Sequence, residues 1–203
     1  MNSNKIIYDS INGLSFEQNI MFALACINRL KHLPQVFINS ETYGIEYLNG
    51  IIPKDKIENI LNEIINKIYY NQIKINEIDA DMEILEKLLL DDDIESGIEK
   101  QLFFCYVVIV IHILEYIKEN KKEYIELCSD NMIEIVDYIK CKEYETKNNL
   151  EDYYILDEKM EKYLEQFCAD EVKKEIEIIK IIKSGNKEML NEYIKNNEIE
   201  YNV

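Results

Sequence analysis

The residues best placed for catalysis in this sequence are a cysteine and a histidine within one apolar stretch. Cys105 and His112 lie seven positions apart, nearly two turns of an α-helix, which brings both side chains to the same side. Such a pair could provide a thiolate nucleophile, and the histidine alone could act as a buried general base. Because Ile and Val surround His112, a core histidine hydrogen-bonded to a neighbour is the favoured interpretation. No glycine-rich phosphate-binding motif accompanies the pair.

A run of acids suggests a metal site. In "DDDIESGIEKQL", which begins at Asp91, Asp93 and Glu95 fill the third and fifth positions of a calcium-binding loop. The sixth position is Ser96 rather than the required glycine, and the twelfth is Leu102 rather than a bidentate glutamate. The pattern therefore fails where the geometry of such loops is strictest, and no calcium site is expected.

Zinc, di-iron and disulfide chemistry are also disfavoured. The chain has two histidines, His32 and His112, and neither belongs to a Glu-x-x-His motif. The cysteines form no C-x-x-C pair, and most have apolar neighbours, as is typical of buried free thiols in a reducing cytoplasm. They are Cys26, Cys105, Cys128, Cys141 and Cys168. We therefore expect no metal and no cofactor.

Arg29 is the single arginine of a chain rich in lysine. Its planar guanidinium can hold a carboxylate through two parallel hydrogen bonds, which lysine cannot do. It could serve a functional site, but a structural salt bridge from the first long helix to a distant acid is favoured. Residues 91–93 are the candidate partner.

The net charge of −17 at pH 7 limits the classes of partner. A surface this acidic repels nucleic-acid backbones and anionic lipids, whereas it attracts basic proteins. The N-terminal "MNSNKIIYDS" lacks a basic region followed by an apolar core, so no signal peptide is expected. The apolar run 102–114 is shorter than the roughly 20 residues of a membrane helix. We expect a cytoplasmic protein that binds neither nucleic acid nor membrane.

Two acidic segments are candidates for partner binding. Residues 77–99 contain ten acids and one lysine, and residues 143–177 contain twelve acids and five lysines among tyrosines. Carboxylates pair with Lys and Arg, while tyrosine supplies contact area at a low entropy cost. The alternative is an ordinary solvated surface. The candidate partner-binding residues are Asp79, Asp81, Glu83, Glu86, Asp91, Asp92, Asp93, Glu95, Tyr153 and Tyr154.

The elements that must position these residues are helices. The chain contains only 5 Gly and 2 Pro, and its apolar residues recur at helical spacing. We predict one all-α domain of about seven or eight helices around a central apolar helix at 97–119, with a linker near 146–156. A capping box is expected at Ser15 with Gln18. The last long helix should end at Ser184 and Gly185, with Asn186 capping a short final helix.

The segment "LSFEQNIMFALACINRL" resembles the opening motif of the YjaG-like family of bacterial helical proteins, through a set of spaced residues. These are Leu14, Gln18, Phe22, Ala25, Cys26, Arg29 and Leu30. "TYGIEYLNGI" is similar to the family's glycine-containing segment before its second long helix. Asn28 departs from the pattern, which has an acid before the arginine. The resemblance implies an all-α, cytoplasmic domain and assigns no catalytic residue.

Three functions follow from these patterns. The first is a non-enzymatic, immunity-type protein that neutralises a basic toxin, for example a nuclease, by covering its cationic surface. The second is a housekeeping YjaG-like protein with a binding or scaffolding role. The third is an enzyme whose pocket combines His112 or Arg29 with carboxylates. The oligomeric state is left open.

Overall fold

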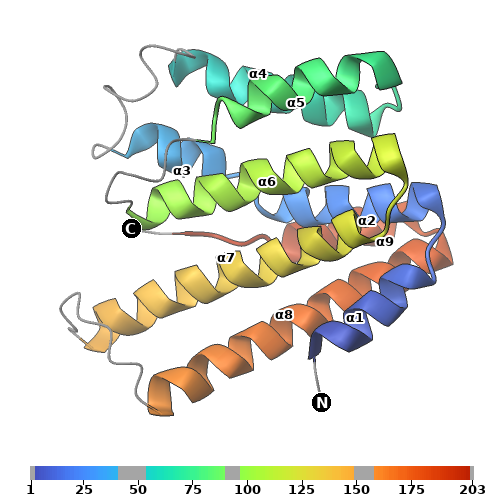
Figure 1. The fold of residues 1–203 in the computed structure, drawn as a ribbon. Helices are drawn as coiled ribbons and strands as arrows, with labels where there is room; N and C mark the ends of the chain where they lie inside the picture. The colour runs from blue at the N-terminus through green and yellow to red at the C-terminus, as the bar shows by residue number, and fades with distance from the viewer. Residues whose placement is uncertain (1–2, 41–53, 90–96, 149–157, 202–203) are drawn as a thin grey trace.

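The computed structural model of the chain describes residues 3–40, 54–89, 97–148 and 158–201 (Figure 1). Within these ranges the chain forms nine α-helices, one 3₁₀ turn at Ile75–Glu77 and no strand, which confirms the predicted all-α class. The helices are α1 (Ser3–Asn12), α2 (Phe16–Arg29), α3 (Leu33–Asn39), α4 (Lys54–Tyr69), α5 (Ile78–Glu86), α6 (Ile98–Glu119), α7 (Glu123–Asn148), α8 (Glu158–Ser184) and α9 (Lys187–Asn196).

Helix α6 is the predicted central helix, and it contacts α2, α3, α5 and α7. It has 22 residues, and its most apolar 18-residue stretch has a mean hydropathy of 1.6, so the helix is long and apolar enough to span a membrane by length and composition. A core helix of a soluble protein meets the same criteria, and 61% of this apolar stretch is buried against its neighbours. Its buried residues join those of the other helices in one hydrophobic core.

Helix α7 lies between α6 and α8, and helix α1, which sequence pattern does not predict, packs against α7 and α8 (Figure 1). Ile7 and Ile11, one turn apart on α1, are both fully buried. Tyr8 donates a hydrogen bond to Asp130 on α7 at 2.6 Å. Helix α7 continues without a break past Ser129.

The structure contains both predicted helix caps, the one at Ser15 and the one at Asn186. Ser15 Oγ accepts from the Gln18 amide at 3.2 Å, and the Gln18 side chain accepts from the Ser15 amide at 3.0 Å. Between α8 and α9, Gly185 has a positive φ of 74°, which favours glycine. Asn186 Oδ1 accepts from the Met189 amide at 3.0 Å and caps α9.

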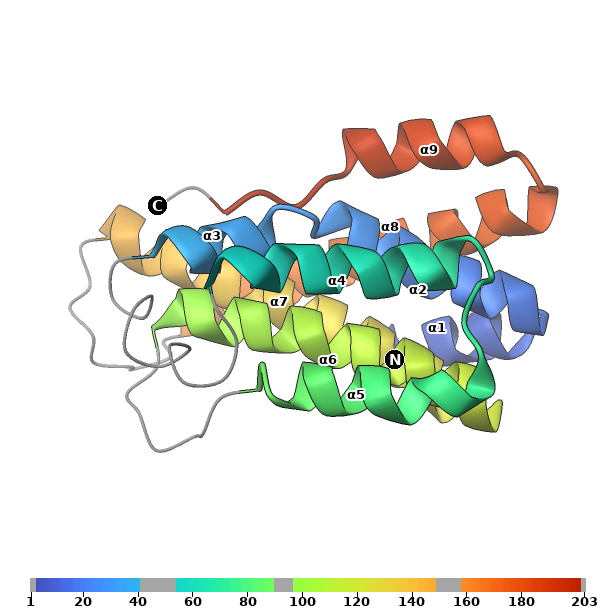
Figure 2. The same cartoon turned by 90° about the horizontal axis from the view of Figure 1, so that it is seen from above.

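The chain returns across the bundle after α9 in an extended segment that runs back toward α3 (Figure 2). The Ile199 amide donates to the Arg29 carbonyl oxygen at 2.8 Å. This segment therefore fixes the far end of α9 to the end of α2.

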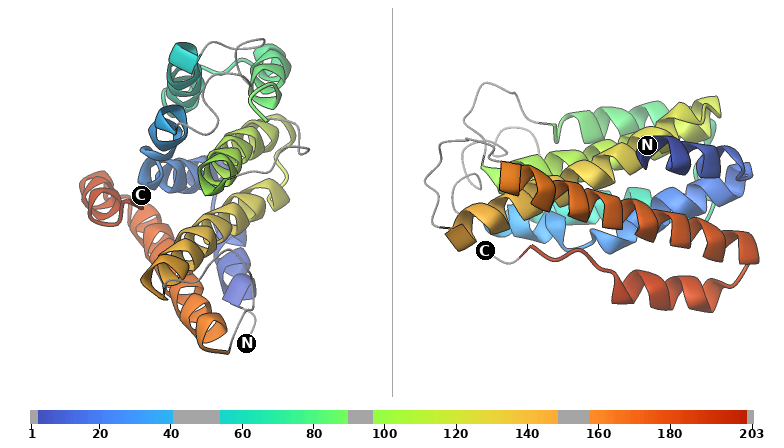
Figure 3. Two further views of the ribbon diagram at one scale, coloured as in Figure 1. Left: turned by 90° about the vertical axis from the view of Figure 1, so that its left-hand side faces the viewer. Right: turned by 90° about the horizontal axis from the view of Figure 1, so that it is seen from below.

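Helices α4 and α5 form an outer layer on the other side of α6 (Figure 3). Lys67 on α4 pairs with Asp81 on α5 at 3.1 Å. The glycine-containing segment within 41–53 and the acids of 91–95 lie outside the described residues. In the predicted linker 146–156, the first three residues belong to α7, and the remainder lies outside the described ranges.

Candidate functional site

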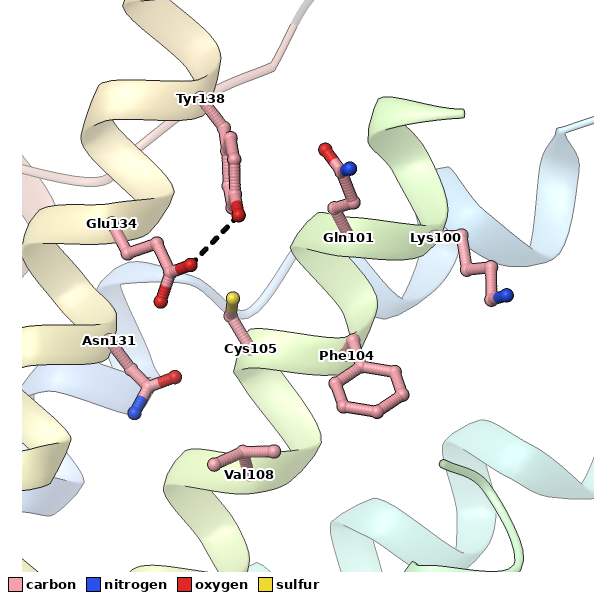
Figure 4. A pocket seen from close by; sticks show the side chains of 8 residues that line it. All are labelled: Lys100, Gln101, Phe104, Cys105, Val108, Asn131, Glu134 and Tyr138. Atoms are coloured by element: carbon pink, nitrogen blue, oxygen red, sulfur yellow. Dashed lines mark hydrogen bonds between the residues drawn. The ribbon is translucent and has the colours of Figure 1, made fainter. Parts of the chain in front are cut away.

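A solvent-open groove lies between α6 and α7 (Figure 4). Its volume is about 350 Å³, which is at the lower end of the range for small-ligand sites. The lining residues of α6 recur every four positions, and those of α7 are three and four positions apart, so each set lies on one face of its helix. The lining residues are Lys100, Gln101, Phe104, Cys105, Val108, Asn131, Glu134 and Tyr138.

Hydrogen bonds fix the polar groups on the α7 side of this groove. Tyr138 donates to Glu134 Oε1 at 2.8 Å, and the Asn131 amide nitrogen donates to the Leu127 carbonyl oxygen at 2.8 Å. The second bond determines the orientation of the amide, so its oxygen points toward α6 (Figure 4). The groove therefore presents acceptor oxygens to solvent.

Cys105 lies between Glu134 and the α6 backbone in the same groove (Figure 4). Burial, with a smaller contribution from the Glu134 charge, raises the pKa of Cys105 to about 12. Burial and the Glu134 hydrogen bond also raise the pKa of Tyr138. Both groups are protonated at neutral pH, so Cys105 is a poor nucleophile here. The arrangement favours binding of a hydrogen-bond donor over covalent chemistry.

Four of the candidate partner-binding residues belong to the described part of the first acidic segment, and all four lie on α5. Asp79, Glu83 and Glu86 are exposed, whereas Asp81 is buried and pairs with Lys67. Asp79 pairs with Lys118 of α6 at 2.5 Å, and Glu83 pairs with Lys87 at 2.8 Å. Three of these four candidate residues thus face solvent, and Asp81 instead joins α5 to α4.

Two exposed tyrosines lie at the end of α4, the helix that pairs with α5 through Lys67 and Asp81. Tyr69 and Tyr70, at the end of α4, are 58% and 63% exposed, and their rings meet edge to face. Ile75, in the connection to α5, is 69% exposed. Tyr69 also lines the cavity between α2, α4 and α9. The α4–α5 pair therefore carries exposed aromatic surface as well as exposed carboxylates.

The other predicted partner-binding residues cannot be placed. Asp91, Asp92, Asp93, Glu95, Tyr153 and Tyr154 lie outside the described residues. In the second acidic segment, Tyr144 and Tyr163 contact each other with ring centres 5.2 Å apart and are half-buried. Those two tyrosines join α7 to α8 rather than projecting into solvent.

Arg29 lies at the centre of a buried polar cluster between α2 and α8. It is fully buried and forms two parallel hydrogen bonds with Glu171, one of them 2.8 Å long between Nη2 and Oε2. Its Nε donates to the Asn197 carbonyl oxygen at 2.8 Å. The partner of Arg29 is therefore an acid of α8, whereas residues 91–93 lie outside the described ranges.

Glu175 lies one turn beyond Glu171 and is also fully buried. Burial first, and the charge of Glu171 second, raise the pKa of Glu175 well above its ordinary value. Ser129 Oγ lies 2.5 Å from its Oε2, and its Oε1 has no hydrogen-bond partner in the described part of the chain. We infer that Glu175 is protonated at neutral pH, since a second buried carboxylate beside Glu171 would be destabilising.

His112 is half-buried on α6, and its Nδ1 lies 2.8 Å from Glu115 Oε2.

Cavities also occur between α7, α8 and the C-terminal segment, and between α2, α4 and α9. Neither His112 nor Arg29 lines these two cavities or the α6–α7 groove. Within the described residues, no group of three or more His, Cys, Asp or Glu side chains could hold a metal ion.

The sequence pattern does not reveal the α6–α7 groove. Glu134 and Tyr138 are four positions apart, and this spacing alone signals that they share a helix face. Gln101 and Phe104 belong to the segment whose sequence predicts a central apolar helix, so the pattern does not mark them as groove residues. Which residues face each other across α6 and α7 depends on the register of two helices, and sequence periodicity does not define that register.

No protein-family model matches the chain, and no curated protein matches it. Among solved structures, the fold is similar to that of a DUF416 family protein from Shewanella baltica OS155. The TM-score is 0.53 over 96% of this chain and 87% of that chain, at 16% sequence identity. DUF416 is an uncharacterised all-helical family, so this likeness shows the fold alone, and the YjaG-like assignment stays a resemblance.

Proposed function

We propose that this protein works by binding a basic protein, and that the binding surface is the outer side of α4 and α5. We call this surface the α4–α5 face. In its most specific form the proposal is an immunity-type function, in which the face covers the cationic active-site cleft of a toxin in the cytoplasm. It consists of Tyr70, Ile75, Asp79, Glu83 and Glu86.

The observation that supports this proposal is the presence of exposed tyrosines and exposed acids on one helical pair. Tyrosine is enriched among residues that dominate binding energy, because it buries a large area with few rotatable bonds. A tyrosine that is 63% exposed, as Tyr70 is, has most of that area left to bury. The neighbouring carboxylates would select a basic partner over neutral ones.

The distribution of charge supports the same conclusion. Among the described residues, the buried carboxylates are Asp81, Glu171 and Glu175. The other described acids are at least partly accessible to solvent, in a chain whose net charge is −17. An acidic exterior accelerates encounter with a cationic protein, and salt weakens this effect.

The test is coexpression with a basic toxin encoded beside this gene, together with binding measurements on the purified pair. We expect rescue of growth, and a Kd that rises at least tenfold between low and high salt. The triple variant Asp79→Asn, Glu83→Gln, Glu86→Gln should weaken binding at least tenfold, mainly through slower association, and Tyr70→Ala should accelerate dissociation.

A matched control removes the same charge elsewhere. Glu165, Glu188 and Glu192 are exposed on α8 and α9, and their triple change to Gln should alter Kd less than threefold. Equal killing with and without this protein would contradict the immunity function. Equal weakening by both triple variants would show that net charge, and not the α4–α5 face, carries the binding.

A housekeeping binding or scaffolding role is the second candidate. It is favoured by the fold likeness to the DUF416 protein, which extends over 96% of this chain. This role predicts a gene neighbourhood without toxins and a growth defect on deletion under ordinary conditions. A deletion strain that grows normally until it is exposed to a toxin would contradict it.

A further inference from the structure

The α6–α7 groove lies close to α5, because α6 contacts both α5 and α7. Helices α5, α6 and α7 lie side by side along the front of Figure 1, and α6 contacts both of the others. A partner bound over the α4–α5 face would therefore reach the groove beside it. The question is which chemical group the groove would accept.

Acceptor oxygens dominate the polar lining of the groove. Tyr138 occupies one position on Glu134 Oε1, which leaves Oε2 and the remaining lone pairs for another donor. The amide oxygen of Asn131 points toward α6, whereas the Gln101 side chain extends away from Asn131, at the Tyr138 end of the groove (Figure 4). The cationic Lys100 side chain is buried and points away from Glu134 (Figure 4). The groove therefore complements a cation with several N–H donors.

The apolar part of the lining adds a shape requirement. Phe104 and Val108 line the α6 side of the groove below the carboxylate (Figure 4). An aromatic ring offers a face on which a planar cation can stack, and apolar walls suit the methylene stem that carries it. Arginine combines a planar guanidinium, five donors and such a stem, whereas lysine presents a compact and strongly hydrated ammonium.

We propose that the α6–α7 groove receives an arginine side chain of the basic partner, with Glu134 as the main acceptor. This inference rests on the proposed function, because it names the residue type that the partner contributes. Glu134 holds the guanidinium, and the Asn131 oxygen accepts a further N–H group. Phe104 stacks against its plane.

The probe is Nα-acetyl-L-arginine methylamide, titrated into the full ¹⁵N-labelled chain and followed by NMR. The matched neutral probe is the citrulline analogue, which keeps the shape and removes the charge. We expect saturable shifts at the side-chain amides of Gln101 and Asn131, and at least tenfold weaker binding of the citrulline analogue. The lysine analogue should bind at least threefold more weakly than arginine.

Two single variants locate the site. Glu134→Gln should weaken arginine binding at least tenfold, whereas Glu123→Gln, an equal charge change on the exposed first turn of α7, should change it less than twofold. Tyr138→Phe removes the competing donor and should leave binding intact or tighter. Far-UV circular dichroism confirms that each variant is folded.

Several results would overturn the inference. Equal binding of the citrulline analogue would exclude charge recognition, and equal binding of the lysine analogue would exclude the preference for arginine. Shifts spread over the whole acidic surface, with equal losses in both glutamate variants, would show non-specific attraction. The titration needs no partner, so its failure leaves the coexpression test intact, and a failed coexpression test leaves the titration intact.

Discussion

Two ion pairs in this protein have similar chemistry and opposite environments. In the pair of Arg29 with Glu171, the side chains are 0% and 1% exposed. In the pair of Glu83 with Lys87, they are 68% and 48% exposed. The first joins two helices 142 residues apart in sequence, and the second links adjacent turns of one helix. Acidic residues therefore serve the interior at one place and remain available to a partner at the other.

The difference arises from the cost of removing charge from water. Removing an ion pair from water costs on the order of several kcal/mol per ion, so a buried pair persists only with good geometry and additional hydrogen bonds. Arg29 meets both conditions, because it forms two parallel bonds with Glu171 and a third with the Asn197 carbonyl oxygen. Exposed pairs remain hydrated, contribute little and can exchange partners. The comparison predicts a graded response to mutation.

The largest expected effect is at Arg29. Arg29→Ala leaves Glu171 buried without its counter-charge, and we expect a loss of about 3–5 kcal/mol in the free energy of unfolding. Urea denaturation followed by circular dichroism measures it. The double variant Arg29→Met with Glu171→Leu should recover most of the loss, because no charge then remains buried in the pair. A loss below about 1 kcal/mol for Arg29→Ala would remove the distinction between the two pairs.

The next effect is a pH dependence due to Glu175. Its folded-state pKa is raised above the ordinary 4.5, so the folded protein holds a proton that the unfolded chain releases. This contribution to stability is complete below the unfolded pKa and is lost as pH rises through the folded pKa, at up to about 1.4 kcal/mol per pH unit.

The control for that prediction is Glu175→Gln, which resembles the protonated acid at every pH. Urea midpoints measured from pH 5 to 8 should fall less steeply for this variant than for the wild type. Parallel profiles would show that Glu175 does not retain a proton in the folded state.

A smaller effect is expected at Asp81, which is buried but pairs with a lysine that is 26% exposed. Asp81→Asn should cost about 1 kcal/mol, because Lys67 can turn toward water or keep its bond to Glu63. Urea denaturation again supplies the value. A loss of stability as large as that of Arg29→Ala would show that the Asp81–Lys67 pair behaves like the buried Arg29–Glu171 pair.

The smallest effect is expected for Glu83→Gln. Its carboxylate is exposed, and its lysine partner lies on the same helix. The urea midpoint should not change measurably, while binding of a basic partner should weaken as part of the α5 triple variant. A clear shift of the midpoint would mean that the pair has a structural role.

Much of the fold follows from local sequence pattern. The capping box at Ser15, the glycine at position 185 and the apolar stripe of α6 depend on neighbouring residues, and the structure contains all three. Helix α1 was not predicted because "SNKIIYDSIN" is short and has no marked cap. Its helical state depends on contacts with α7 and α8.

The candidate site is less predictable for a related reason. Sequence pattern indicates that α5 is acidic and amphipathic, and the exposed Asp79 and Glu83 agree with that pattern. It does not indicate that the helix beside α5 ends in the exposed Tyr69 and Tyr70, or that Glu134 and Gln101 line one groove. These relations depend on helix packing over long sequence separations. The partner of Arg29 was unpredictable in the same way.

The attachment of the chain beyond α9 to Arg29 also affects how the molecule opens. Helix α9 is short, and Leu190 is the residue that it buries. Alone it would fray, but the bonds at Asn197 and Ile199 hold its far end to the interior. Amide hydrogens of this final helix should therefore exchange with solvent together with those of α2, in one cooperative opening.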